Sequence, residues 1–202
     1  MQGPGSPDED RSGGFDRGGW LVPFHDDDMG RLIDETFTHA DELLLGRRTY
    51  DMMQAYWSQV TDPDDIVARG LNTLPKHVAT TRPESLTWAN SHAIEGDLVA
   101  AVAALKSKPG RELQVHGSHG LVQTLLAAGL VDQLNVWTFP VVVGTGKRLF
   151  PSGMPAVSAR RISTDSTGAG AVITSYELVG PADYGSFVVD EGREAVSMGE
   201  DR

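Results

Sequence analysis

Apolar positions that recur three and four residues apart predict a series of amphipathic helices. The clearest case places Met29, Leu32, Ile33 and Phe37 on one face, directly after an acidic triplet that suits a helix N-terminus. Other segments combine helical spacing with start or stop signals. They are residues 49–60, 64–74, 97–106 and 121–128.

Short apolar runs between these segments predict strands. They are residues 42–45, 77–80, 86–88, 112–116, 134–139, 157–163 and 171–179. Strands alternate with helices through most of the chain, and the last two form a pair. This order predicts an α/β three-layer sandwich, with a mainly parallel central sheet and antiparallel C-terminal edge strands.

The same pattern sets the predicted domain organisation. With 202 residues the chain suits one domain. Residues 1–14, rich in Gly, Pro, Ser and Asp, are expected to form a flexible loop, and residues 15–180 the folded domain. Residues 181–202 are polar and acidic, and we expect most of this tail to be mobile.

Charge and composition narrow the function classes. The net charge of −11 lies mostly in residues 1–30 and 180–202, and a globally negative field argues against nucleic-acid binding. The absence of cysteine excludes disulfides, thiolate zinc sites and cysteine nucleophiles. Neither a signal-peptide pattern nor a run of about 18 apolar residues is found, so we expect a cytoplasmic protein without a membrane partner.

Candidate chemistry lies at two strand-to-helix junctions, LLLG-RRTY (43–50) and LQVH-GSHG-LVQTLL (113–126). Unpaired amides at a helix start favour anions, glycine lets an anion approach, and arginine can hold phosphate with two hydrogen bonds. The alternative is that the glycines mark ordinary turns and the arginines are solvated. Neither junction has the G-x-G-x-x-G spacing, and GTGKR (144–148) lacks the Walker spacing, so both common nucleotide motifs are excluded.

Four motifs, each at the end of a predicted strand, follow one another along the chain. GRRTY is followed by TTRP, then by GSHGLVQTLL, then by FPVVVGTGKRLF. This series resembles the dihydrofolate reductase-like family, in particular the branch related to the reductase domain of the riboflavin-pathway deaminase-reductase. The resemblance covers residues 15–180.

The resemblance implies NADPH as cofactor and assigns residues to it. One group lies against the cofactor's phosphates, a second near the adenosine 2′-phosphate, and a third beneath the pyrophosphate and nicotinamide ribose. In that order they are Gly46, Arg47, Arg48 and Thr49; Thr80, Thr81 and Arg82; and Gly117, Ser118, His119, Gly120 and Leu121. The implied activity is hydride transfer to a C=N or C=O bond of a small heterocyclic or ribosylamino-pyrimidine substrate, as in 5-amino-6-(5-phosphoribosylamino)uracil reductases.

Substrate contacts and the proton donor are less closely defined. Trp20 and Phe139 are candidates for the substrate mouth, although Trp20 equally suits a lid over the core edge. Asp27 is the candidate catalytic carboxylate, and helix capping is the alternative role for it and Asp28. His25 has no second histidine at ligand spacing, so we expect no metal site. Exposed strand edges lead us to expect a homodimer.

One feature of the family is not found in this sequence. Relatives open with a strand that ends in an S-x-D-G-like turn, whereas this chain begins MQGPGSPDED, so we expect the first strand to be absent and Met1 to be an internal methionine. A catalytically silent nucleotide-binding relative, acting as sensor or scaffold, is therefore the alternative function. Binding of another phosphorylated small molecule at the same junctions is a third hypothesis.

Overall fold

Four parallel strands form the sheet that carries both predicted junctions. The computed structural model describes residues 1–199, and it orders these strands β3 (Ser91–Ala93), β2 (Lys76–Ala79), β1 (Ala40–Gly46) and β4 (Glu112–Gln114). In central β1, Leu43, Leu44 and Leu45 have no exposed surface. Such a continuous apolar run is typical of a parallel strand covered on both faces.

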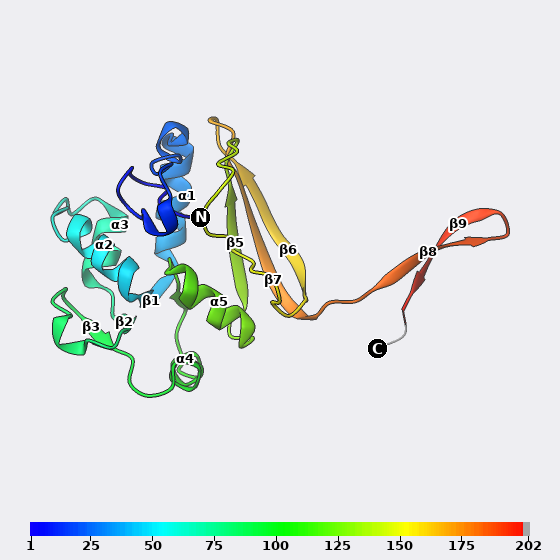
Figure 1. Cartoon of the computed structure of the whole chain (residues 1–202). Helices are drawn as coiled ribbons and strands as arrows, with labels where there is room; N and C mark the ends of the chain where they lie inside the picture. The colour runs from blue at the N-terminus through cyan, green and yellow to red at the C-terminus, as the bar shows by residue number, and fades with distance from the viewer. Residues whose placement is uncertain (200–202) are drawn as a thin grey trace.

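Helices cover the two faces of this sheet with separate cores (Figure 1). On one face pack α1 (Asp27–Thr38), α2 (Arg47–Trp57) and α3 (Ile66–Thr73), with Phe37, Leu43, Tyr50 and Leu71 among the buried residues. On the other face pack α4 (Leu98–Lys106) and α5 (His119–Ala127), around Leu44, Val102, Leu121 and Leu125.

A second, antiparallel sheet follows in the order β5 (Gln133–Thr138), β7 (Val172–Pro181), β6 (Val157–Ser166). The predicted fold class, α/β with a mainly parallel central sheet and antiparallel C-terminal strands, is confirmed. The two sheets are not hydrogen-bonded to each other, and within residues 1–199 no strand precedes β1. No helix among these residues is both long and apolar enough to cross a membrane.

The N-terminal segment, expected as a flexible loop, packs against the loop that follows β5. It holds the short 3-10 helix η1 (Ser12–Gly14), and a second one, η2 (Val22–Phe24), follows it. The side-chain amide of buried Gln2 donates to the Asp10 carbonyl at 3.0 Å and accepts from the Lys147 backbone N–H at 3.1 Å. Lys147 and Asp10 also form an ion pair. Flexibility of residues 1–14 stays a prediction, but these contacts tie the segment to the domain.

The strand predicted at residues 86–88 is wrong. These residues form an irregular segment after the 3-10 helix η3 (Pro83–Ser85), and the strand lies instead at Ser91–Ala93. Trp88 is buried in the helix-covered core, and its backbone N–H donates to the Tyr50 hydroxyl at 2.8 Å. The apolar residues that indicated a strand therefore serve the packing of a loop.

Strands β8 (Gly185–Asp190) and β9 (Arg193–Met198) form a hairpin in the segment expected to be a mobile tail. Glu191 and Gly192, both with positive φ, make the turn. The hairpin projects away from the rest of the molecule (Figure 1). The acidic composition of this segment predicts a tail without strands, whereas the alternation of its apolar residues is typical of a strand. Mobility of the tail stays a prediction, and residues 200–202 lie outside the described residues.

Candidate functional site

The two predicted junctions contact each other directly. The Gly46 backbone N–H donates to the Gly117 carbonyl at 3.2 Å, and the Thr49 hydroxyl lies 3.3 Å from that of Ser118. A Cβ on Gly46 would lie 2.0 Å from Oγ and 2.7 Å from Cβ of Ser118, so only glycine permits this approach. The ends of neighbouring strands β1 and β4 thus meet at one point.

The helices that begin at this point differ from the others in their N-termini. In α1, α3 and α4 an aspartate caps the helix, accepting from a first-turn N–H at 2.8 to 2.9 Å; these are Asp26, Asp65 and Asp97. Helices α2 and α5 follow Gly46 and Ser118, and neither has a side-chain cap. Their first-turn amides are therefore available to an anion.

A hollow of about 310 Å³ lies between these two helix starts. Nine residues line it: Gly46, Arg47, Arg48, Ala79, Leu98, Ser118, Gly120, Leu121 and Thr124. It lies at the carboxyl ends of β1 and β4, where chain connections leave the sheet toward opposite faces. Open α/β sheets bind ligands at such a switch point.

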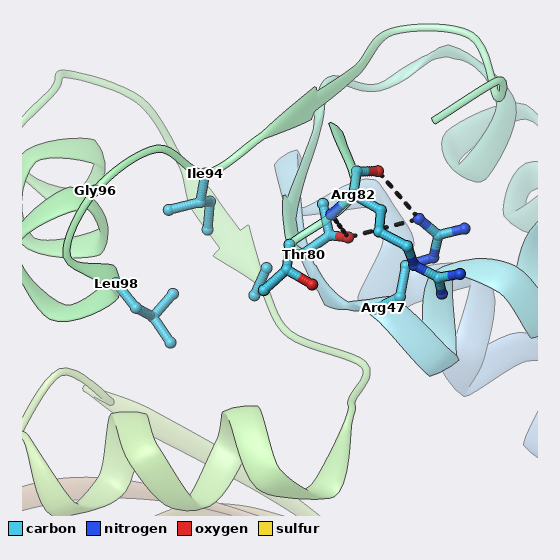
Figure 2. Close-up of a pocket in the computed structure, with 8 residues that line it drawn as sticks. Arg47, Thr80, Arg82, Ile94, Gly96 and Leu98 are labelled. Atoms are coloured by element: carbon cyan, nitrogen blue, oxygen red, sulfur yellow. Dashed lines mark hydrogen bonds between the residues drawn. The ribbon is translucent and has the colours of Figure 1, made fainter. Parts of the chain in front are cut away.

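A second hollow of about 350 Å³ adjoins the first and shares Arg47, Ala79 and Leu98 with it. Its other lining residues are Thr80, Thr81, Arg82, Ile94 and Gly96. Figure 2 shows Arg47 reaching across to the segment after β2. Its Nη1 donates to the Thr80 hydroxyl at 3.5 Å, to the Arg82 carbonyl at 3.3 Å and to the Ser85 hydroxyl.

The two adjoining hollows form one groove. Its three arginines differ in the contacts that their side chains make. Arg47 is also paired with Asp51, with Nε 2.8 Å from Oδ1, and this hydrogen bond raises the pKa of its guanidinium. Among residues 1–199, the guanidiniums of Arg48 and Arg82 have no hydrogen-bond or ion-pair partner. Arg47 therefore orders the groove, and the charges of Arg48 and Arg82 remain for a ligand.

Three of the predicted cofactor residues do not line either hollow. Gly117 has φ of +129°, and a Cβ there would lie 2.8 Å from the Thr49 hydroxyl. These two residues therefore pack against each other where the junctions meet. The His119 ring is engaged with the Arg148 carbonyl at 2.9 Å and with Gln123 at 2.9 Å. These contacts give the three residues a structural place beside the groove.

Five lining residues escaped the sequence analysis: Ala79, Ile94, Gly96, Leu98 and Thr124. Ile94 and Gly96 follow β3, which had been predicted too early in the chain. Placing β3 correctly would have identified them, because the carboxyl ends of parallel strands share one edge. Thr124 lies one turn inside α5, and no motif marks it.

The predicted substrate-binding aromatics lie together, away from the lining of the hollows. Trp20 packs edge-on against Phe139 with ring centroids 5.6 Å apart, and Phe24 is 6.1 Å from the same ring. The Trp20 indole N–H donates to the Gln2 carbonyl at 2.9 Å. The cluster is therefore fixed by the N-terminal segment on one side and by the end of β5 on the other.

The three aspartates at the start of α1, Asp26 to Asp28, make different contacts. Asp26 is the cap, and its second oxygen accepts from the Ala169 N–H at 2.7 Å; hydrogen bonds from Met29 and then Ala169 lower its pKa. Asp28 accepts from the Gly168 N–H at 3.2 Å. The capping role weighed for Asp27 and Asp28 thus belongs to Asp26. Asp27 is exposed and has no hydrogen-bond partner among the described residues.

Among residues 1–199, no group of three His, Cys, Asp or Glu residues could hold a metal ion.

Comparisons with known proteins agree with this architecture. The family model described as "RibD C-terminal domain" matches residues 13–173. The uncharacterized protein YyaP of Bacillus subtilis (strain 168) is 27% identical over 157 residues, which cover 77% of this chain and 82% of YyaP.

Two crystal structures share the fold. A "Putative riboflavin biosynthesis protein" from Shewanella sp. PV-4 is 22% identical with a TM-score of 0.64, over 81% of this chain and 89% of that one. A pyrimidine reductase-like protein from Corynebacterium diphtheriae is 15% identical with a TM-score of 0.52, over 79% of this chain and 84% of that one.

Proposed function

Because the chain belongs to the RibD C-terminal domain family, we propose that it is an NADPH-dependent reductase of a small ring compound. The substrate is a heterocycle or ribosylamino-pyrimidine with a reducible C=N or C=O bond, as in riboflavin or folate chemistry. The reaction resembles the reduction of 5-amino-6-(5-phosphoribosylamino)uracil.

One observation carries the proposal: two uncapped helix N-termini meet in a hollow lined by arginine. The α2 and α5 amides together with the Arg48 guanidinium offer a dinucleotide's pyrophosphate the donors that it requires. The three other long helix starts are closed by aspartate, so this arrangement is local to the groove.

The second hollow supports the choice of NADPH over NADH. Arg82 lies there beside the Thr80 and Thr81 side chains, and its guanidinium has no partner among residues 1–199. A 2′-phosphate placed there would gain charge-assisted hydrogen bonds that a 2′-hydroxyl does not make. Arg47 would support both phosphate sites, because it lines both hollows.

The protein's own residues would bind and orient, and NADPH would supply the hydride. Trp20, Phe24 and Phe139 form an apolar wall that suits the flat face of a ring substrate and excludes water from it. Asp27, three residues after Phe24 and unpaired among the described residues, is our candidate for holding a proton at the substrate.

A second candidate function is that of a catalytically silent nucleotide-binding relative. It is favoured by the side chains beside Asp27, because Asp26 and Asp28 are occupied in holding the loop at residues 168–169. If Asp27 is merely solvated, no carboxylate of this helix start remains for catalysis.

The test is a titration of the protein with NADPH and NADH, followed by turnover assays. Replacing Arg82 with Ala should weaken NADPH about tenfold or more and leave NADH nearly unchanged, because one charge-assisted contact is lost. Replacing Arg69 on α3, outside the groove, with Ala is the matched control. Equal weakening of both nucleotides would contradict the 2′-phosphate site, and absence of binding would contradict the proposal.

Loss of NADPH absorbance with a panel of pterins and ribosylamino-pyrimidines then separates enzyme from silent binder. Turnover that falls on replacing Asp27 with Asn, with NADPH affinity unchanged, would support the reductase. Nucleotide binding without turnover of any panel member would favour the second candidate.

A further inference from the structure

The β8–β9 hairpin has one strongly apolar face. Phe187 and Val196 are cross-strand partners, and Val189 and Met198 lie on the same side by the two-residue alternation of strands. Their exposed fractions are 77%, 67%, 83% and 67% in that order. Glu194, opposite Val189, is the charged residue on this face. The other face carries Val188 and otherwise small or polar residues, such as Ser186, Ala195 and Ser197. A patch of this kind marks an interaction surface.

The hairpin forms a two-stranded sheet of its own and projects away from the domain (Figure 1). An isolated two-stranded hairpin is marginally stable in water, so it gains from a further strand or an apolar cover. Its own domain does not supply either one. The hairpin lies beyond the residues that match the family model, which end at 173.

The base of the hairpin is held in a defined direction. The Ala182 backbone N–H donates to the Ala156 carbonyl at 3.3 Å, and the Asp183 N–H donates to the Ser158 hydroxyl at 3.4 Å. Only three residues separate β7 from β8. The hairpin is therefore an arm directed outward by the start of β6.

The same chain offers a strand with one open edge that fits this arm. β6 is a ten-residue edge strand bonded only to β7, and it exposes Val157 and Ile162 by 38% and 55%. Open edges of this length recruit a further strand. Each copy of the chain thus carries one apolar hairpin without cover and, in β6, an open sheet edge. The other edge of this sheet is β5, which is shorter and carries no basic side chain.

Charge favours this pairing over other occupants. The hairpin has Asp190, Glu191 and Glu194 against Arg193, whereas β6 has Arg160 and Arg161 against Asp165. Arg160 is already paired with Glu177 of β7, so Arg161 is the basic side chain of β6 that is left to meet the acidic arm. An anionic membrane surface would repel that arm.

We propose that the β8–β9 hairpin of one copy adds to the β6 edge of a second copy, with Phe187, Val189, Val196 and Met198 packed against that partner. A twofold axis makes the exchange reciprocal, so both hairpins and both edges are covered in one closed dimer. This defines the contact of the homodimer expected from the sequence, and it does not depend on the proposed function.

The hairpin is large enough for such a contact. A specific interface buries about 1,200 Å² or more in total, so each surface of two reciprocal contacts supplies about 300 Å². A buried phenylalanine alone contributes about 150 Å², and three further apolar side chains flank Phe187.

The first measurement is the mass of the full chain in solution by sedimentation. Wild type should have twice the chain mass of 21.7 kDa. The double variant Phe187→Ser, Val196→Ser should shift the dimer dissociation constant by about 100-fold or more, because each change is made in two contacts. Val188→Ser, on the other face of β8, is the matched control. Circular dichroism confirms that each variant is folded.

The second measurement identifies the receptor by cross-linking, for which a chain without cysteine is well suited. Ser197→Cys places a thiol on the hairpin and Ser163→Cys places one on β6. Mixing the two proteins, one carrying a size tag, with a short bis-maleimide should link hairpin to edge.

Three results would overturn the proposal. They are a monomeric wild type throughout the concentration range, a dimer untouched by the double variant, and cross-links that join hairpin to hairpin instead of hairpin to β6. The last would mean that the two arms pair with each other.

Discussion

The parallel and antiparallel halves of the molecule differ in how far their sheets are covered by other elements. In the parallel half, helices close both faces and three consecutive leucines of β1 have no exposed surface. In the antiparallel half, Ile173 is the single buried residue of β5, β6 and β7. The buried half therefore fixes the groove, and the open half keeps surface for other contacts.

The largest expected effect comes from emptying the core of the parallel half. Leu44→Ala should lower the free energy of unfolding by about 2–5 kcal/mol, because a cavity opens among Val102, Leu121 and Leu125. Val179→Ala on β7, where the side chain is 55% exposed, should change it by less than about 1 kcal/mol. Urea denaturation measures both, and similar losses would remove the contrast between the halves.

The next effect concerns the point where the two junctions meet. Gly46→Ala should destabilise the protein by about 2 kcal/mol and weaken nucleotide binding, because its Cβ would overlap Ser118 and separate β1 from β4. Gly30→Ala in α1, where a Cβ meets nothing within 4 Å, should instead stabilise by about 1 kcal/mol. Thermal unfolding and NADPH titration of both variants check this, and unaltered binding by Gly46→Ala would show that the close approach is dispensable.

A smaller effect comes from Lys76 of β2, the one charged residue that is buried among residues 1–199. Burial lowers its pKa to about 8, although Nζ donates to the Leu74 carbonyl at 2.8 Å and lies 4.8 Å from the Trp88 ring centroid. The folded state thus binds fewer protons than the unfolded state between pH 8 and 10.5, so stability should rise across that range.

Replacing Lys76 with Met keeps the length of the side chain and removes the titration. The rise above pH 8 should disappear, and stability at neutral pH should increase by about 1 kcal/mol. Denaturant unfolding at several pH values measures the free energy of unfolding of both proteins. A rise that persists in the variant would assign the titration to another group.

The smallest effect lies in the open half, where the N-terminal segment is attached to the loop after β5. Burial alone would raise the pKa of Asp10, but hydrogen bonds from Lys147 and Ser12 outweigh it and lower the pKa. The stability that ionised Asp10 contributes is therefore present above the ordinary aspartate pKa of 3.8, and it is lost as the pH falls below that value.

Asp10→Asn should remove that acid dependence and lower stability at neutral pH by about 1 kcal/mol or less. Trp20 bonds to the Gln2 carbonyl, so its fluorescence should report release of the segment. Asp16→Asn, whose carboxylate is 75% exposed, is the control. An unchanged acid transition in Asp10→Asn would contradict the role of the ion pair.

Much of the parallel half could be predicted because burial leaves a strong pattern. Apolar runs such as 43–45 and aspartates before helical spacing gave strands and helix starts close to those observed. Residues from both junctions and residues 80–82 line the two hollows, and their role in binding a cofactor stays a prediction. The signal is strong because each residue there satisfies both local geometry and the core.

The rest depends on tertiary contacts that leave little local signal. Trp88 resembled a strand residue because it fills the core from a loop, where it bonds with Tyr50. The attachment of residues 1–14 rests on Gln2 and Asp10 meeting a loop more than 130 residues away. The β8–β9 hairpin was hidden by its acidic composition, since its apolar residues have no cover in their own chain.

The position of Arg47 in both hollows has a thermodynamic consequence. Two halves of a dinucleotide, added as separate fragments, would compete for or share one guanidinium that is already ordered by Thr80 and Arg82. Linkage requires that whatever the first fragment does to the affinity of the second, the second does equally to the first. Calorimetry with adenosine 2′-phosphate and pyrophosphate, alone and together, would give this coupling free energy. Its loss in Arg47→Ala would assign it to that side chain.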